Sequence, residues 1–257
     1  MPVTGITNRE LLFLSALLGV DNIWGIEDPF RGADGEINRE DLTALRNALV
    51  RNGCLRPMSD GAVRVGGDCA ELIDVCQKSN RVYLLDTSQY EREGAKLRFF
   101  VNGDAVVRFQ YRRTASLARV RKEIMEAEIA EFFAGQVDRT LYETYSTDVV
   151  RLKRMGGLTG RHFLQELKTD GCGEQLAALI VEGLQNNSGF RSMLVCDRYG
   201  TREALVGKLI VLECNGNSLM VHAAEDMSTV QFAVASQDGL SRVLRELLGE
   251  RAEADVV

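Results

Sequence analysis

The chain carries one strand–turn–strand pattern twice, and this repetition narrows the folds open to it. The first copy is KLRFFVNGDAVVRFQYR at 96–112, and the second is GKLIVLECNGNSLMVHAA at 207–224. In each copy an Asn-Gly pair, Asn102-Gly103 or Asn215-Gly216, separates two alternating apolar runs. This is a strong hairpin signal, because both central residues of a type I′ turn need positive φ. The pattern predicts two hairpins and therefore a pseudo-symmetric sheet.

Each hairpin has strand patterns beside it and a helical pattern after it. Further strands are expected at 81–88, 192–200 and 228–236, and charged amphipathic helices at 116–133 and 238–250. The second hairpin is apolar on both faces, so we expect its sheet to be buried on both sides. The expected fold class is α/β of the α+β type, with a quasi-two-fold central antiparallel sheet flanked by helices.

Residues 1–80 add a helical segment that resembles a winged helix. Helices are expected at 7–19, 38–53 and 69–79, the last capped by Asp68, with a short strand at 62–66. Residues 134–190 are expected to connect the two sheet units and to contain a helix at 173–185. We expect one domain over 1–257, divided into 1–133, the helical connection 134–190, and 191–257.

Composition favours a protein of the cytoplasm. No apolar run reaches the ~18 residues of a membrane span, and the start of the chain lacks the basic leader of a signal peptide. The six cysteines include no C-x-x-C pair, so we expect buried, reduced thiols and no metal site. No membrane insertion is expected.

Charge argues against a nucleic-acid partner. The net charge is −6, and residues 1–80 hold eight Lys and Arg against twelve Asp and Glu. A recognition helix at 38–53 would present Glu40 and Asp41 where phosphates lie. A basic run from 105 to 122 is either a solvated face or a docking patch for an acidic partner. A winged-helix regulator with a ligand-sensing α/β domain therefore remains only the alternative.

The residues offer no recognisable catalytic site or cofactor site. His162 and His222 fall in different elements, and no G-x-S-x-G elbow is present. GTREALVGK at 200–208 has the wrong spacing for a phosphate loop and leads into a strand. We expect no enzyme, no catalytic residue and no cofactor. An unreadable enzyme site stays open if His162 or His222 clusters with an acid and a thiol.

The first hairpin supplies the candidate binding residues. Alternation is expected to place Leu97, Phe99 and Val101 with Val107, Phe109 and Tyr111 on one apolar face under helices. The opposite face would mix arginine, glutamine and phenylalanine, residue types suited to an interface, although a solvated sheet face has the same pattern. The candidate partner-binding residues are Arg98, Phe100, Arg108, Gln110 and Arg112.

The order of elements at both ends resembles a known family. ELLFLSALLGVDNIWGI, a helix ending ALVRNGCL, DGAVRVG, CAELIDVC and VYLLDT are followed much later by FAVAS and DGLSRVLREL. This order resembles the EspG-type chaperones of type VII (ESX) secretion, including their EsaE-like relatives in Gram-positive bacteria.

The resemblance implies a cytoplasmic, non-enzymatic adaptor. Such a protein binds the helical tip of a helical-hairpin substrate and keeps it soluble until it reaches the secretion ATPase. The family's binding surface matches stretches 88–112 and 238–248 here. A homodimer is left open. A substrate-specific secretion chaperone is thus the leading hypothesis.

Overall fold

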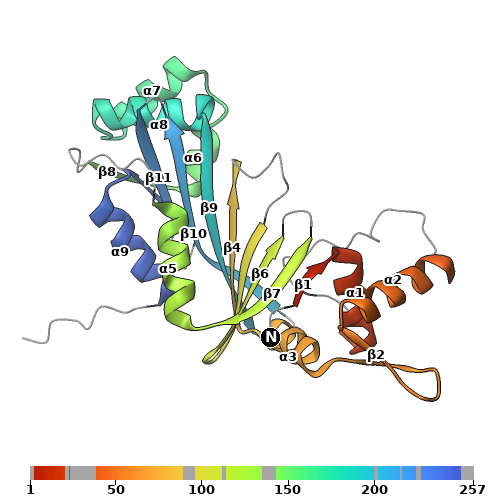
Figure 1. Ribbon diagram of the computed structural model, residues 1–257. Helices are drawn as coiled ribbons and strands as arrows, with labels where there is room; N and C mark the ends of the chain where they lie inside the picture. Colours follow the sequence, from red (N-terminus) through yellow and green to blue (C-terminus); the bar gives the residue numbers. More distant parts are fainter. Residues whose placement is uncertain are drawn as a thin grey trace, which may run out of the picture. The chain divides into compact units, whose positions relative to one another are not determined.

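A computed structural model describes residues 3–20, 23, 39–88, 96–111, 114–134, 143–199, 202–214, 216–223 and 227–249. The chain divides into two compact units, which are described separately (Figure 1). Unit 1 comprises Met1–Leu84 and Glu93–Met125, and unit 2 comprises Leu85–Arg92 and Glu126–Val257.

Unit 1 is built from short N-terminal elements and an antiparallel run of strands. Its elements are β1 Val3–Ile6, α1 Asn8–Leu17, α2 Arg39–Arg51, β2 Leu55–Pro57, β3 Val63–Val65, α3 Gly67–Lys78, β4 Arg81–Thr87, β5 Lys96–Asn102, β6 Ala105–Tyr111, β7 Ala115–Val120 and the start of α5 Lys122–Phe133. The strand order is β1-β7-β6-β5-β4, while β2 and β3 form a separate hairpin.

Unit 2 has a similar composition of elements. It holds β8 Thr144–Asp148, α6 Val149–Met155, α7 Gly160–Thr169, α8 Glu174–Asn186, β9 Gly189–Tyr199, β10 Arg202–Cys214, β11 Asn217–Ala223, β12 Thr229–Val234 and α9 Gln237–Leu248. The strand order is β4-β9-β10-β11-β12-β8, and β4 contributes its second half. The ten strands form the antiparallel sheet flanked by helices that the sequence predicted, so the fold class is confirmed.

The internal repeat extends further than the two hairpins. In unit 1, β1 and a helical stretch precede the meander β4–β7 and then α5. In unit 2, β8 and three helices precede the meander β9–β12 and then α9. Strand β1 pairs with β7 and β8 pairs with β12, each with the last strand of its meander. Residues 143–186, expected to be part of a connection, therefore occupy the same topological place as the N-terminal elements.

The first hairpin turns one residue later than the Asn-Gly pattern predicted. Asn102 pairs with Ala105, so the central residues are Gly103 and Asp104. Gly103 has φ of 58°, while Asp104 is not in the positive-φ region. A two-residue turn with glycine first is the type II′ geometry, which needs positive φ only at that position. In the second hairpin Gly216 has φ of 85°, and Asn215 lies outside the described residues.

Two local predictions were wrong. The helix expected from 116 begins only at Lys122, because Leu117 pairs with Phe109 and residues 115–120 form β7. Ala115 and Leu117 are buried while Ser116 and Ala118 are half-buried, the alternation of a strand. Helix α3 begins at Gly67 with Gly66 as its N-cap, so Asp68 lies in the first turn and is not the cap.

The N-terminal helices of unit 1 share a core with its sheet. Leu11 and Leu14 of α1 and Leu72 and Ile73 of α3 are buried with the sheet residues, which are Phe100, Val107, Phe109, Ala115 and Leu117. A winged-helix domain would instead bury these helices in a core of its own. The N-terminal segment is therefore part of the sheet unit, and the regulator alternative loses its structural basis.

Unit 2 buries its sheet on both faces, as expected. Leu219 and Val230 pack on one face with α7 and α8, whose buried residues include Phe163, Leu167, Leu176 and Ile180. His222 lies on the other face, where its ring comes 3.9 Å from Glu246 of α9. Helices therefore cover both faces of this sheet, which explains why the second hairpin carries apolar residues on both faces (Figure 1).

Candidate partner-binding site

The register of β5 and β6 separates the residues that the sequence had grouped. Arg98 lies opposite Phe109, Phe99 opposite Arg108, and Phe100 opposite Val107. Residues directly opposite each other share a face of the sheet. A two-residue turn pairs even-numbered residues of one strand with odd-numbered residues of the other. The expectation of one apolar face and one arginine face was therefore wrong.

Arg98 and Phe100 lie on the face that packs against the helices of unit 1. Phe100 is 0% exposed and belongs to the core, and Arg98 is 5% exposed. The Arg98 guanidinium donates a hydrogen bond from Nη1 to the carbonyl oxygen of Leu97, at 3.0 Å. Neither side chain forms an open docking surface.

Arg108 and Gln110 lie on the opposite face and are half-buried. They are opposite Ala118 and Ser116 of β7, whose side chains are small. Arg112 lies outside the described residues. Of the predicted set, Arg108 and Gln110 are the two described residues that are neither fully buried nor part of the core around the N-terminal helices.

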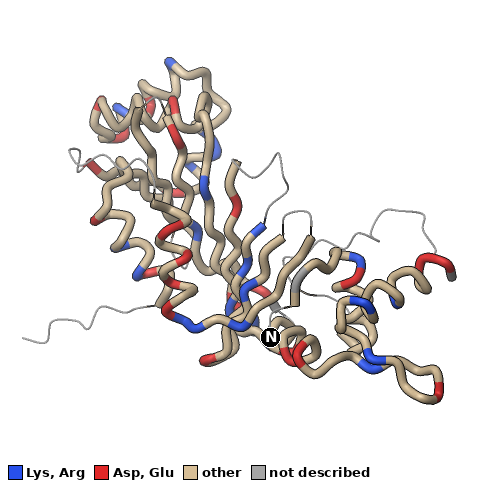
Figure 2. The backbone as a smooth tube through the Cα atoms, in the orientation of Figure 1, with Lys and Arg blue, Asp and Glu red and all other residues tan. Residues whose placement is uncertain are grey.

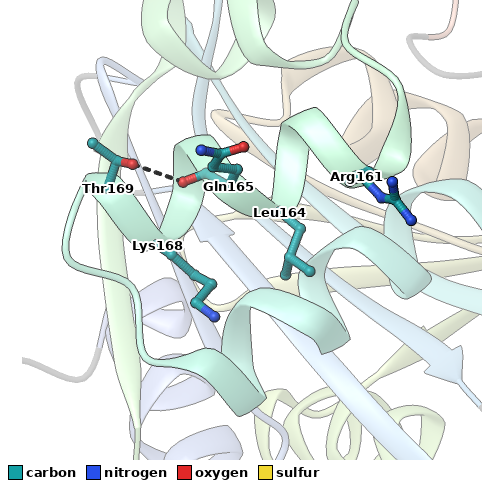
Figure 3. Close-up of a pocket in the computed structure, with 5 residues that line it drawn as sticks. All are labelled: Arg161, Leu164, Gln165, Lys168 and Thr169. Carbon is teal, nitrogen blue, oxygen red and sulfur yellow. Dashed lines mark hydrogen bonds between the residues drawn. The ribbon is translucent and has the colours of Figure 1, made fainter.

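A second surface, which was not predicted, lies on α7. Its outer face lines a shallow pocket of about 390 Å³ (Figure 3), formed by Arg161, Leu164, Gln165, Lys168 and Thr169. Phe163 and Leu167, on the inner face, are buried. The signal was present in the sequence, because these lining residues recur at helical spacing while the inner residues are apolar.

Hydrogen bonds order part of this outer face. The Thr169 hydroxyl donates to the carbonyl oxygen of Gln165 at 2.9 Å (Figure 3). The Lys168 ammonium lies 2.6 Å from a carboxylate oxygen of Glu174, at the start of α8. Lys168 is thus held by an acid, while Arg161 is an exposed cation at the other end of the pocket.

Apolar and basic residues lie near the pocket-lining residues in sequence. Gly160 adjoins α8, since a Cβ there would lie 2.9 Å from Oε1 of Gln185. In sequence, Leu158 lies two residues before Gly160 and Leu184 lies next to Gln185. Their side chains are 37% and 42% exposed. Residues 149–165 contain four Lys and Arg and no acid (Figure 2). Exposed leucines beside cations are a surface suited to a partner with an apolar ridge and acidic edges.

The titratable groups give little support for catalysis. Burial raises the pKa of the Cys172 thiol to about 11 and that of Cys196 to about 12, so both are protonated near neutral pH. His162 is exposed and bonds to the Thr159 hydroxyl at 2.8 Å, whereas His222 is buried beside Glu246. Across the residues that the structure describes, no group of three or more metal-ligating side chains is found.

A membrane-crossing helix is also not found in the part of the chain that the structure describes. The longest described helices, such as α2 and α8, are short and carry charges.

Comparison with known proteins gives a structural likeness only. No protein-family model matches the chain, and no curated protein matches its sequence. Among solved structures, the chain is similar to the Mycobacterium tuberculosis type VII secretion system chaperone EspG5, solved in complex with the PE25-PPE41 dimer. The TM-score is 0.68 with 11% identity, and the match covers 98% of each chain. At this identity the likeness shows a shared fold.

Proposed function

We propose that this protein is a non-enzymatic chaperone of type VII secretion that binds a helical-hairpin export substrate. The observation that carries the proposal is the end-to-end fold likeness to EspG5, a chaperone solved with a bound PE25-PPE41 dimer. A likeness over 98% of both chains includes both sheet units and the helices around them. The same architecture can therefore offer the same kind of binding surface.

Two surfaces are candidates for the contact with the substrate. The first comprises Arg108 and Gln110 of β6, and the second is the outer face of α7 with Leu158 and Leu184. The α7 surface joins exposed apolar area to cations, a combination that suits the tip of a helical hairpin with acidic edges. Apolar residues would supply binding energy, and the cations would steer and orient the partner.

The wider role follows from binding. The chaperone would act in the cytoplasm, cover the apolar tip of its substrate and release it at the secretion ATPase. Contact with that ATPase and formation of a homodimer are further predictions of this role.

Co-expression tests the proposal. The tagged chain is produced with each helical-hairpin protein encoded beside its gene, purified by affinity and gel filtration, and the complex mass is measured by light scattering. We expect one neighbour to co-purify in a stable complex and to become insoluble when expressed alone. If every neighbour fails to co-purify while the chaperone itself is folded, the proposal is wrong.

A further inference from the structure

Cys54 is held in place by the end of α2. Gly53, with φ of 72°, follows the helix, and its N–H bonds to the carbonyl oxygen of Val50 at 3.1 Å. The Cys54 N–H bonds to the carbonyl oxygen of Leu49 at 2.9 Å. This pair of bonds is the Schellman motif, which fixes the backbone of both residues after the helix. Cys54 and Leu49 are both buried, which completes the apolar contact of that motif.

Cys69 is held in place by the start of α3. The N–H of Gly66, the N-cap of this helix, bonds to the carbonyl oxygen of Cys54 at 2.8 Å. A Cβ at Gly66 would lie 3.5 Å from that oxygen, so the chain after Cys54 passes close to the helix start. Cys69 follows in the first turn, where it is 6% exposed.

The two thiols meet at the base of the β2–β3 hairpin. Leu55 pairs with Val65 in the last rung of that hairpin, and Cys54 and Gly66 come directly outside it. The side chains of Cys54 and Cys69 interact with each other, and the Cys54 thiol also donates to the carbonyl oxygen of Asn52 at 3.9 Å. Both thiols are buried.

We propose that Cys54 and Cys69 are a disulfide-forming pair that ties the β2–β3 hairpin to α3 when a small peroxide is present. The contact between the thiols lowers the pKa of Cys54 and raises that of Cys69. Cys54 is therefore the thiol that loses its proton first and acts as the nucleophile.

The chemistry balances with the peroxide as the oxidant. The Cys54 thiolate attacks one peroxide oxygen, the O–O bond breaks, and Cys54 becomes a sulfenic acid while water or an alcohol leaves. The Cys69 sulfur then attacks Sγ of Cys54, the S–O bond breaks, and water leaves with the proton of the Cys69 thiol. Two thiols are oxidised to one disulfide, and one peroxide is reduced.

The bond would add a covalent link to the β2–β3 hairpin, which its ladder, a hydrogen bond from Arg46 to the carbonyl oxygen of Gly61 and the burial of Leu55 already hold. It closes a loop of about 15 residues that contains the hairpin, and so restricts the unfolded chain. Strands β2 and β3 have only three residues each, too few to be stable alone. The oxidised protein should therefore unfold at a temperature higher by a few degrees.

Peptide mapping of the full chain tests the proposal. The reduced protein is treated with one equivalent of hydrogen peroxide, remaining thiols are alkylated, and a tryptic digest is analysed without reduction. Tandem mass spectrometry must separate Cys69 from Cys76, which share a tryptic peptide. We expect a Cys54–Cys69 bond in most molecules, and a melting temperature that falls by a few degrees after dithiothreitol is added.

Variants sharpen the test. Cys54→Ser and Cys69→Ser should each remove the bond and the shift in melting temperature, while Cys172→Ser, a buried thiol of unit 2, should keep both. Mapping of the wild-type chain decides the matter alone if a serine variant fails to fold. Reduced Cys54 after treatment, Cys54 oxidised to a sulfinic acid, or a bond to Cys76 would each overturn the proposal.

Discussion

Tyr145 links an edge strand to two helices through a carboxylate. Its hydroxyl donates a hydrogen bond to Asp170, the C-cap residue of α7. The same carboxylate lies 2.5 Å from Nη1 of Arg151 on α6. The ring of Tyr145 stacks on Phe232 of β12, with ring centres 6.3 Å apart. One buried side chain thus connects β8, α6, α7 and β12.

Removing this hydroxyl should weaken the native state measurably. Tyr145→Phe keeps the ring and loses a hydrogen bond to a charged group, so we expect a loss of about 1.5–3 kcal/mol in the free energy of unfolding. Urea denaturation measures it. In a double-mutant cycle with Asp170→Asn, the coupling energy should exceed about 0.5 kcal/mol. Additive losses would show that the bond contributes nothing.

Tyr145 should also make the stability of the fold depend on pH in alkaline solution. Burial, and then the hydrogen bond to Asp170, raise the pKa of Tyr145 to about 12. The pKa of a tyrosine in the unfolded chain is ~10. The stabilisation that the Tyr145 hydroxyl gives the folded state is therefore complete below that pH and is lost as pH rises toward 12. Wild type should therefore lose more stability than Tyr145→Phe across this interval. An equal loss of unfolding free energy in wild type and in Tyr145→Phe over this pH interval, measured by urea denaturation, would contradict this.

At the residue scale, the sequence showed how side chains alternate within each strand. It did not show which residues of two paired strands lie on the same face of the sheet. The alternation of β5 and β6 was read correctly within each strand. The face shared by Phe100 and Val107 depends on the pairing across the turn, and a two-residue turn pairs odd-numbered with even-numbered residues. The prediction grouped the odd-numbered residues of both strands, and this error placed Arg98 and Phe100 on a supposed surface, whereas the later turn by itself leaves the shared faces unchanged.

Helix α8 approaches its sheet closely because it carries a glycine. A Cβ at Gly183 would lie 2.9 Å from Cδ2 of Leu219 and 3.2 Å from Sγ of Cys214. Gly183→Val should therefore overpack this contact and cost about 1–3 kcal/mol in the free energy of unfolding, measured by urea denaturation. Gly67→Val is the matched control, since a Cβ at Gly67 meets nothing within 4 Å and the change there should cost less than half as much.

The contact between β11 and α9 should respond to pH. Burial lowers the pKa of His222, Glu246 opposes this effect, and Arg242 adds to it. Leu209 and Gln231, its neighbours on β10 and β12, carry no charge. The histidine is therefore favoured neutral in the folded chain, so stability is complete above the unfolded pKa of ~6.5 and is lost as pH falls through it.

Comparison of variants isolates this effect. Between pH 7.5 and pH 5.5, wild type should lose up to about 1 kcal/mol more stability than His222→Gln. His162→Gln changes an exposed histidine and should keep the wild-type dependence. Equal pH dependence in wild type and His222→Gln would remove His222 as the cause.

At the element scale, the sequence predicted the long periodic segments well. Strands β4–β6 and β9–β12 of the two meanders and helices α1, α2, α3, α8 and α9 were expected close to their observed bounds. Strands β1, β2, β7 and β8 were missed. Strands β1, β2 and β8 have only three to five residues, too few for a clear alternation. Residues 115–120 of β7 were taken as the start of the helix that follows them.

At the scale of the whole molecule, partner binding decides between the two candidate surfaces. Arg108→Glu and Arg161→Glu are equal charge reversals on β6 and α7. The substitution at the true interface should weaken substrate binding about tenfold or more, measured by titration calorimetry, with little change in melting temperature. The other variant serves as the matched control. If both variants bind like wild type, neither surface is the site.

The sequence alone reached the fold class and the hypothesis of a chaperone, but not the binding surface. Fold class depends on patterns that recur over the whole chain, and these tolerate local errors. A binding surface depends on which few side chains stay exposed after packing, as Leu158 and Leu184 do. Periodicity predicts the buried face of α7, and only the packed structure shows the pocket on its outer face.

The topological repeat has an evolutionary consequence. Two successions of strand, helices, four-stranded meander and helix are the expected product of duplication and fusion of a half-length gene. The two subunits of a homodimer come from one gene, so every substitution changes both. The two halves of a fused chain accumulate substitutions independently. One copy can then change its surface while the other preserves the scaffold. The half-buried arginine on β6, and a β11 that has no Lys, Arg, Asp or Glu, are differences of this kind.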